Sequence, residues 1–154
     1  MFLYRVADAL RRARVPFAVA GGYAVALHGA VRGTVDVDIV IGLKKKDFLA
    51  AENALKGLGL VPRLPVTAAD VFDFREEYVR KRNLVAWSFY DPKDPTSVLD
   101  VLIAHDLTRM SVVRVESEGH VLPVLALSDL IAMKKASGRP QDLEDVRALK
   151  ELNP

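Results

Sequence analysis

Hydrophobic positions recur along the chain with two spacings, which predict helices alternating with short strands. The helix-like spacing of three to four residues predicts helices at 2–14, 23–30, 47–58, 68–72, 75–82, 128–136 and from 139 onward. β-branched or alternating runs predict strands at 17–20, within 32–42, and at 84–90, 97–103, 112–115 and 120–124. The last two strands would form a hairpin.

The same spacing predicts how several helices begin, end and pack. Ser128 is expected to cap the helix at 128–136, and Gly138 is expected to end it. In the helix at 47–58, Leu49 is expected on the buried side. The last helix is expected to pack through a stripe made of Leu143, Val146, Leu149 and Leu152.

The composition is that of a folded domain. Of the 154 residues 51% are hydrophobic, which predicts a single domain over residues 1–154 with a sizeable core. The chain has no cysteine, which excludes disulfides, zinc–thiolate sites and thiol catalysis. No apolar run reaches membrane-spanning length and no signal-peptide pattern opens the chain, so we expect a cytoplasmic protein without a membrane partner.

The charge is almost balanced, but the basic residues are clustered. A net charge of +2 is too small to imply a nucleic-acid partner. The clusters are Arg5 with Arg11, Arg12 and Arg14; Lys44 to Lys46; Arg75 with Arg80 to Arg82; and Lys134 with Lys135 and Arg139. They are either solvated faces or parts of a polyanion-binding surface around an acidic centre.

Two aspartates interrupt the most β-branched run of the chain. In a strand Asp36 and Asp38 would point to the same face, and two close carboxylates favour a cation between them, for which Mg²⁺ is the natural candidate. With 13 Asp in 154 residues, however, an Asp-x-Asp triplet arises about once by chance. An edge strand with a solvated acidic face is the alternative.

A third aspartate, Asp100, lies in the second strongly apolar strand, at 97–103. If the two strands are neighbours, Asp100 completes a three-carboxylate cluster of the kind that binds paired Mg²⁺ ions. Alternatively, Asp100 lies at the exposed start of its strand. Before these strands, Gly21 and Gly22 form either a phosphate-binding turn or only a tight turn between strand and helix. Together these features suit phosphoryl or nucleotidyl transfer.

The combination of motifs resembles the DNA polymerase β-like nucleotidyltransferase superfamily, and in particular its small bacterial AbiEii-like and MenT-like branch. The matching motifs are Gly21-Gly22-Tyr23-Ala24, His28-Gly29, Arg32-Gly-Thr34-Val-Asp36-Val-Asp38-Ile, Ser-Val-Leu-Asp100-Val, Leu130-Ile-Ala-Met-Lys134 and Gly138-Arg139-Pro140-Gln-Asp142-Leu. The resemblance implies an α/β (α+β) nucleotidyltransferase fold, in which helices flank a mixed central β-sheet and the last two helices form a pair.

The resemblance also implies roles for individual residues. Asp36 and Asp38 would bind metal, and Asp100 would be the third metal carboxylate and a candidate general base. Lys134 would lie near the nucleotide or acceptor, and Asp142 would hold that lysine or Arg139. An exposed helix face with an ordinary ion pair is the alternative for Lys134 and Asp142.

The residues around the glycine turn are candidates for phosphate binding. The family more often has Gly-Ser, so here Gly21 and Gly22 would bind phosphate through backbone groups alone. Arg32 and Thr34 would either orient phosphate or buttress the site, and Arg139 joins them as a candidate nucleotide-binding residue. The histidine of this region, His28, is expected to be packed and hydrogen-bonded rather than catalytic.

These expectations describe an enzyme that uses two Mg²⁺ ions to move a nucleoside monophosphate from an NTP to a hydroxyl, with release of pyrophosphate. The resemblance implies a tRNA 3′ end, a protein side chain or a small molecule as acceptor, a role in a toxin–antitoxin system, and a cognate antitoxin or a second copy as partner. The alternative is a non-catalytic nucleotide- or partner-binding module with the same fold.

Overall fold

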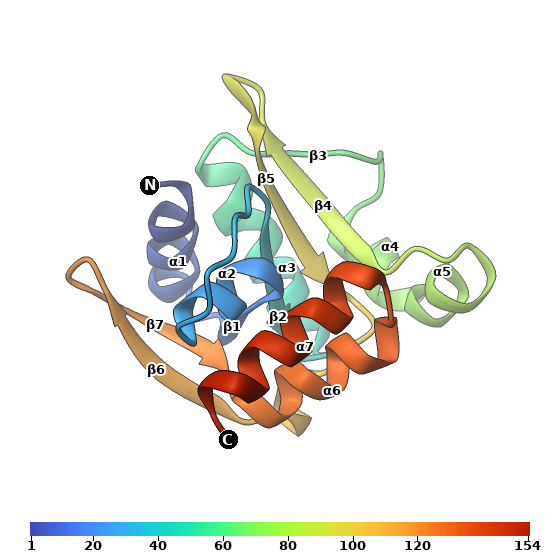
Figure 1. The fold of residues 1–154 in the computed structure, drawn as a ribbon. Coiled ribbons are helices and arrows are strands. Elements are labelled where there is room, and N and C mark those ends of the chain that lie inside the picture. Colours follow the sequence, from blue (N-terminus) through green and yellow to red (C-terminus); the bar gives the residue numbers. More distant parts are fainter.

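The strands join into one mixed sheet in the order β3-β4-β5-β2-β1-β7-β6 in the computed structural model, which describes residues 1–154 (Figure 1). They are β1 (Phe17–Ala20), β2 (Val37–Ile41), β3 (Val61–Pro62), β4 (Ala86–Asp91), β5 (Asp94–Leu102), β6 (Val112–Ser117) and β7 (His120–Leu125). β2 pairs in parallel with β5, as does β1 with β7, and the other neighbours are antiparallel.

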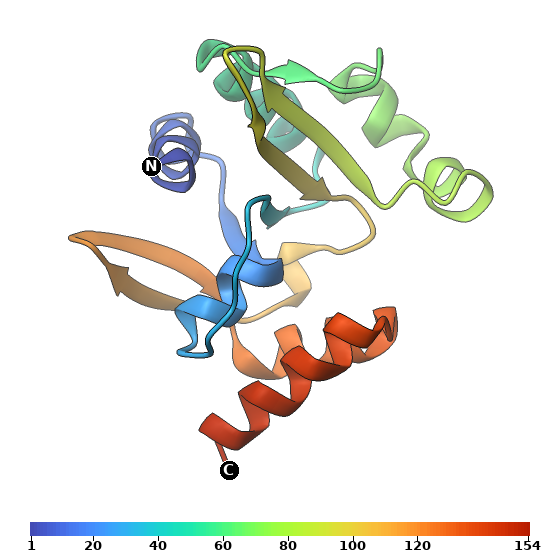
Figure 2. The same cartoon turned by 45° about the horizontal axis from the view of Figure 1, so that its top comes forward.

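Helices cover both sides of this sheet, as Figures 1 and 2 show. They are α1 (Phe2–Arg12), α2 (Gly21–Leu27), α3 (Lys45–Gly57), α4 (Ala68–Asp73), α5 (Arg75–Lys81), α6 (Leu127–Ser137) and α7 (Pro140–Leu152), with a short 3₁₀ turn at Leu107–Arg109. α1 contacts α3 on one side, and the paired α6 and α7 lie on the other. The predicted mixed sheet with flanking helices and a C-terminal helical pair is therefore confirmed.

The centre of the sheet places three parts of the site side by side. In β2, Val37 and Ile39 are fully buried on one face, while Asp38 between them points to the other. Asp38 is the register partner of Asp100 in β5 and of Ala20 in β1, directly before the glycine turn. The register thus brings Asp38 and Asp100 together beside that turn.

The C-terminal pair packs differently from the prediction. Leu143 and Leu152 are 54% and 53% exposed. The predicted hydrophobic stripe of α7 is therefore wrong at both of its ends. α7 instead buries Asp142 and Asp145 beside Val146 and Leu149. These two carboxylates can be buried because they form ion pairs. Ionic contacts as well as hydrophobicity therefore determine which face of α7 is buried.

Three local predictions also need correction. β2 begins at Val37, so Asp36 precedes the strand instead of lying within it. α6 begins at Leu127 with no side-chain cap, and Ser128 is already helical. Leu49 is 41% exposed because α3 packs through other positions. Gly138 does end α6, in the left-handed conformation with φ of 63°. No helix has both the length and the apolar character needed to cross a membrane.

Candidate functional site

The glycine turn lies against the carboxylate of β2. Gly21 is the first residue of α2 and has a φ of +62°, a conformation that glycine adopts without steric cost. A Cβ atom on Gly21 would lie only 1.8 Å from Asp38 Oδ2. A Cβ atom on Gly22 would lie 2.8 Å from Thr34 Oγ1. Both glycines are therefore required by close packing within the site.

We expect Gly21→Ala to destabilise the protein by about 2 kcal/mol, because it adds a left-handed alanine and a clash with Asp38. Urea denaturation followed by circular dichroism measures the change. Gly57→Ala is the matched control, since nothing lies within 4 Å of a Cβ atom there and its φ is ordinary. That control should be neutral or slightly stabilising, and equal losses in both variants would contradict the packing argument.

Asp38 and Asp100 form a carboxylate pair at the centre of the site. The pKa of Asp38 is raised from 3.8 to about 7, first by burial, then by the negative charges of Asp100 and Asp36 and by a hydrogen bond with Asp100. Ser88, the register partner of Asp100 in β4, donates a hydrogen bond from Oγ to Asp100 Oδ1 at 2.5 Å. This serine holds one carboxylate oxygen of Asp100 in place.

The carboxylates provide the donor set that Mg²⁺ prefers, namely oxygen ligands with net negative charge. Burial, followed by the negative charges of Asp100 and Asp36, raises the pKa of Asp38, so the carboxylate pair favours a shared proton or a bound cation. No three acidic or histidine side chains converge as a complete metal-binding group in this arrangement. Asp38 and Asp100 therefore fit a cation as a pair, and Asp36 lies within electrostatic range of them.

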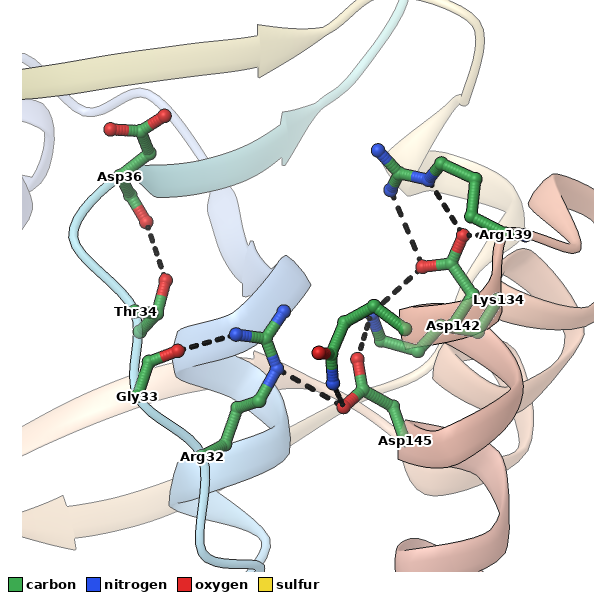
Figure 3. Close-up of polar contacts among 9 residues, drawn as sticks. Arg32, Gly33, Thr34, Asp36, Lys134, Arg139, Asp142 and Asp145 are labelled. Carbon is green, nitrogen blue, oxygen red and sulfur yellow. Dashed lines mark hydrogen bonds and ion pairs between the residues drawn. The ribbon is translucent and has the colours of Figure 1, made fainter.

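A chain of alternating charges links the loop before β2 to the two C-terminal helices (Figure 3). Asp145 accepts a hydrogen bond from Arg32 Nε at 3.0 Å and pairs with Lys134 Nζ at 2.9 Å. Lys134 Nζ also pairs with Asp142 at 3.4 Å, and Asp142 accepts from Arg139 Nε at 2.8 Å. Each buried carboxylate thus contacts two cations.

The cations determine the ionisation of these buried aspartates. Burial alone would raise the pKa of Asp145, but hydrogen bonds from Lys134 and Gln141 and the positive charges of Lys134 and Arg32 lower it below its usual value. Burial would also raise the pKa of Asp142, but the hydrogen bond and charge of Arg139 and the charge of Lys134 lower it below its usual value. Both carboxylates are therefore ionised at neutral pH and hold Lys134 between them.

Figure 3 shows that the loop before β2 is held by its own polar contacts. Arg32 donates to the carbonyl of Gly33 as well as to Asp145, and Thr34 Oγ1 donates to the carbonyl of Asp36 at 3.3 Å. The Asp36 side chain points away from Lys134 and Arg139. Arg32 and Thr34 thus contact the loop and α7, and a role in orienting phosphate stays a prediction for both.

A single cavity of about 910 Å³ connects these groups. All ten residues that the sequence nominated line it: Gly21, Gly22, Arg32, Thr34, Asp36, Asp38, Asp100, Lys134, Arg139 and Asp142. Their chemical roles stay predictions, but they share one site. Outside it, His28 is bonded through Nε2 to the carbonyl of Leu125 at 2.8 Å, as expected for a packed histidine.

Solved structures with a similar fold were found for almost the whole chain. The antibiotic-resistance factor ANT(2″)-Ia is 12% identical with a TM-score of 0.65, over 96% of this chain and 80% of that protein. The lincosamide antibiotic adenylyltransferase LnuA, bound to lincomycin, is 12% identical with a TM-score of 0.64, over 99% and 96%. TM1012 of Thermotoga maritima, assigned as a nucleotidyltransferase, is 17% identical with a TM-score of 0.61, over 98% and 90%.

The chain has the nucleotidyltransferase fold. No family model matches its sequence, and no curated protein does. At identities below 25% the likeness establishes the fold alone, and the AbiEii-like and MenT-like branch stays a prediction.

Three residues near the centre of this nucleotidyltransferase fold were missed from the sequence. Asp145 lies three residues after Asp142 on α7, a spacing that places both on one helix face and could have revealed it. Ser88 is recognisable only from the pairing of β4 with β5. His105 lines the cavity, where burial lowers its pKa, and no sequence motif marks it.

Proposed function

We propose that this protein is a Mg²⁺-dependent nucleotidyltransferase, which transfers a nucleoside monophosphate from an NTP to a hydroxyl group. The observation that carries the proposal is the contact between Asp38 and Asp100 beside the Gly21 turn, inside one cavity. Nucleotidyltransferases with the same fold support it. ANT(2″)-Ia was solved in complex with adenylyl-2″-tobramycin, an adenylylated antibiotic.

The side chains of the cavity suit the steps of this reaction. The oxygen of the acceptor hydroxyl forms a bond to the α-phosphorus, the bond from that phosphorus to the pyrophosphate oxygen breaks, and Asp100 accepts the hydroxyl proton. Backbone groups of the glycine turn, with Arg139 and Lys134, bind the triphosphate. Asp38 and Asp100 would hold Mg²⁺, which would neutralise charge on the phosphates and the leaving pyrophosphate, and the charge of Asp36 nearby would add to the attraction for the cation.

Nucleotide binding is tested by thermal unfolding with ATP, CTP, GTP and UTP, each with and without Mg²⁺. At saturating NTP with Mg²⁺ we expect a rise in Tm of about 5 to 10 °C, because a ligand at 100 times its Kd stabilises by about 2.7 kcal/mol. Asp8→Asn, a change at a half-exposed side chain outside the cavity, should retain the rise. A rise that does not depend on Mg²⁺, or no rise with any NTP, would contradict the proposal.

The acceptor is tested by incubation with labelled NTP, Mg²⁺ and either total tRNA or a cell lysate. Labelled product distinguishes the enzyme from the alternative, a nucleotide-binding module that has kept the fold without catalysis. The module would show the Mg²⁺-dependent thermal shift but no label transfer with any acceptor.

Intact Asp38 and Asp100 favour the enzyme, because a module without metal would be more stable with a neutral residue at either position. A toxin–antitoxin role and an antitoxin partner stay predictions.

A further inference from the structure

The sheet has two edge strands, and only one of them is protected against pairing with another chain (Figure 1). β3 at one edge has two residues, and one of them, Pro62, has no backbone N–H group to donate. β6 at the other edge has six residues and contains neither proline nor lysine, which often block pairing at exposed edges. β6 is therefore an open edge for a further strand.

The ladder between β6 and β7 shows which backbone groups of this edge face outward. The N–H group of Ala126 donates to the carbonyl of Ser111, and bonded and non-bonded pairs alternate from there along an antiparallel ladder. The non-bonded positions of β6 are Val112, Arg114 and Glu116. Pro123, which has no N–H group, lies opposite the middle one. The N–H and C=O groups at these positions point away from β7, to the side where no strand of the chain pairs.

Two opposite charges on β6 make this edge complementary to itself. Arg114 and Glu116 are two residues apart, so both side chains point to the same face, where both are exposed. Neither forms an ion pair within the chain. If two copies of β6 pair antiparallel with Val115 facing Val115, Arg114 of each copy lies opposite Glu116 of the other. The two-fold symmetry of such a pair repeats this contact.

The backbone pattern selects the same register. Arg114 and Glu116 both have outward N–H and C=O groups, so each opposite pair exchanges two hydrogen bonds across the two copies. The neighbouring registers that keep such bonds place Arg114 opposite itself or Glu116 opposite itself. Like charges directly opposite each other destabilise a sheet, so only the register centred on Val115 satisfies both backbone and charge.

We propose that β6 binds a second copy of this chain, and that the two sheets continue into each other through an antiparallel β6–β6 pair centred on Val115. The dimer has a two-fold axis perpendicular to the sheet. Val112 and Val113, which are 41% and 39% exposed in the single chain, lie within the interface and add apolar contact to it. No residue of β6 lines the cavity of the candidate site, so this pairing is independent of the proposed function.

Disulfide formation tests the register, because the chain has no cysteine of its own. In the dimer Val115 faces itself as a non-hydrogen-bonded pair, with Cα atoms about 4.5 Å apart, which a disulfide can span. Val115→Cys should therefore form a covalent dimer in an oxidising glutathione buffer. Val113→Cys is the matched control and should not, because it lies opposite Ser117 of the second copy. Non-reducing electrophoresis measures the fraction that is cross-linked.

Charge reversal tests the ionic contacts, with sedimentation equilibrium as the measurement. Arg114→Glu alone and Glu116→Arg alone each place like charges opposite each other twice, so each should weaken dimerisation about tenfold or more. An equimolar mixture of the two variants has opposite charges at every contact and should form heterodimers, which native mass spectrometry separates from homodimers by mass. Arg82→Glu, at an exposed position directly after α5, is the control and should dimerise as the wild type does.

Several outcomes would overturn the inference. A wild type that stays monomeric up to about 0.5 mM would exclude the dimer and assign this edge to a strand of another protein. Unchanged dimerisation of both charge variants would assign the dimer to another surface. Cross-linking of Val113→Cys as complete as that of Val115→Cys would exclude the register. Variants that are folded by far-UV circular dichroism but form no heterodimer in the mixture would exclude the ionic contacts.

Discussion

Asp38→Asn is expected to abolish nucleotidyl transfer while making the metal-free protein more stable at high pH. Loss of one carboxylate from the central pair removes a metal ligand, for which we expect a rate loss on the order of 10³-fold. The same change removes a buried charge that Asp100 and Asp36 repel. One residue therefore has opposite effects on function and on stability.

The stability effect has a defined pH dependence. Because folding raises the pKa of Asp38 from 3.8 to about 7, the folded protein binds a proton more tightly than the unfolded chain does. The stabilisation that comes from protonated Asp38 is complete below about pH 4 and is lost as the pH rises through 7. At pH 8 with EDTA we expect Asp38→Asn to raise the free energy of unfolding by about 2 kcal/mol, with a much smaller gain at pH 4.

Asp36→Asn is the informative comparison, because Asp36 is exposed and precedes the strand. Its loss should also reduce transfer if it binds metal, but should leave the unfolding free energy at pH 8 within about 0.5 kcal/mol of the wild-type value. Urea denaturation in EDTA at both pH values measures these differences. An Asp38→Asn variant that is less stable than wild type at pH 8 would show that the carboxylate pair is not strained.

The fold was predictable to the extent that local pattern determines it. The apolar runs at 37–41 in β2 and 98–102 in β5 form strands because their apolar residues are buried, and one aspartate interrupts each run, Asp38 in the first and Asp100 in the second. That these strands are neighbours does not follow from either run, because about sixty residues separate the two aspartates and pairing depends on the whole sheet. The resemblance to a known family supplied this step.

The helical pair shows where pattern reasoning fails. A spacing rule based on hydrophobicity places Leu143 and Leu152 inside and charged residues outside. In the structure both leucines are more than half exposed, while Asp142 and Asp145 are 2% and 3% exposed. A carboxylate can be buried only when cations reach it. Asp142 pairs with Arg139 at the start of the same helix, but the cations that reach Asp145 come from α6 and from the loop before β2. The partners of Asp145 are therefore invisible within one helix.

The buried ionic contacts of Asp145 predict that its loss strongly destabilises the fold. Asp145→Ala removes the partner of Arg32 Nε and of Lys134 Nζ and leaves Lys134, whose side chain is 8% exposed, with only the 3.4 Å contact to Asp142. Removing one member of a buried ion pair costs about 3 to 5 kcal/mol. Since Arg32 can reach solvent, we expect about 3 kcal/mol and a fall in Tm of about 10 °C.

Glu144→Ala is the matched control for this change. Glu144 is the preceding residue of α7, and its ion pair with Arg147 joins two side chains that are 64% and 67% exposed. An exposed pair contributes little, so its loss should cost less than about 0.5 kcal/mol. Thermal unfolding of both variants, with far-UV circular dichroism to verify helix content, separates buried from exposed pairing. Similar losses in the two variants would contradict the assigned role of Asp145.

The pH dependence of the Asp145 variant distinguishes loss of charge pairing from loss of packing. The folded-state pKa of Asp145 is lowered, so its contribution is present above the unfolded value near 4 and is lost as the pH falls through the folded-state pKa. The difference between wild type and Asp145→Ala should therefore shrink below about pH 4, whereas a packing defect would persist there. Lys134→Met combined with Asp145→Leu should cost less than the sum of the single changes, because neither partner is then left buried and unpaired.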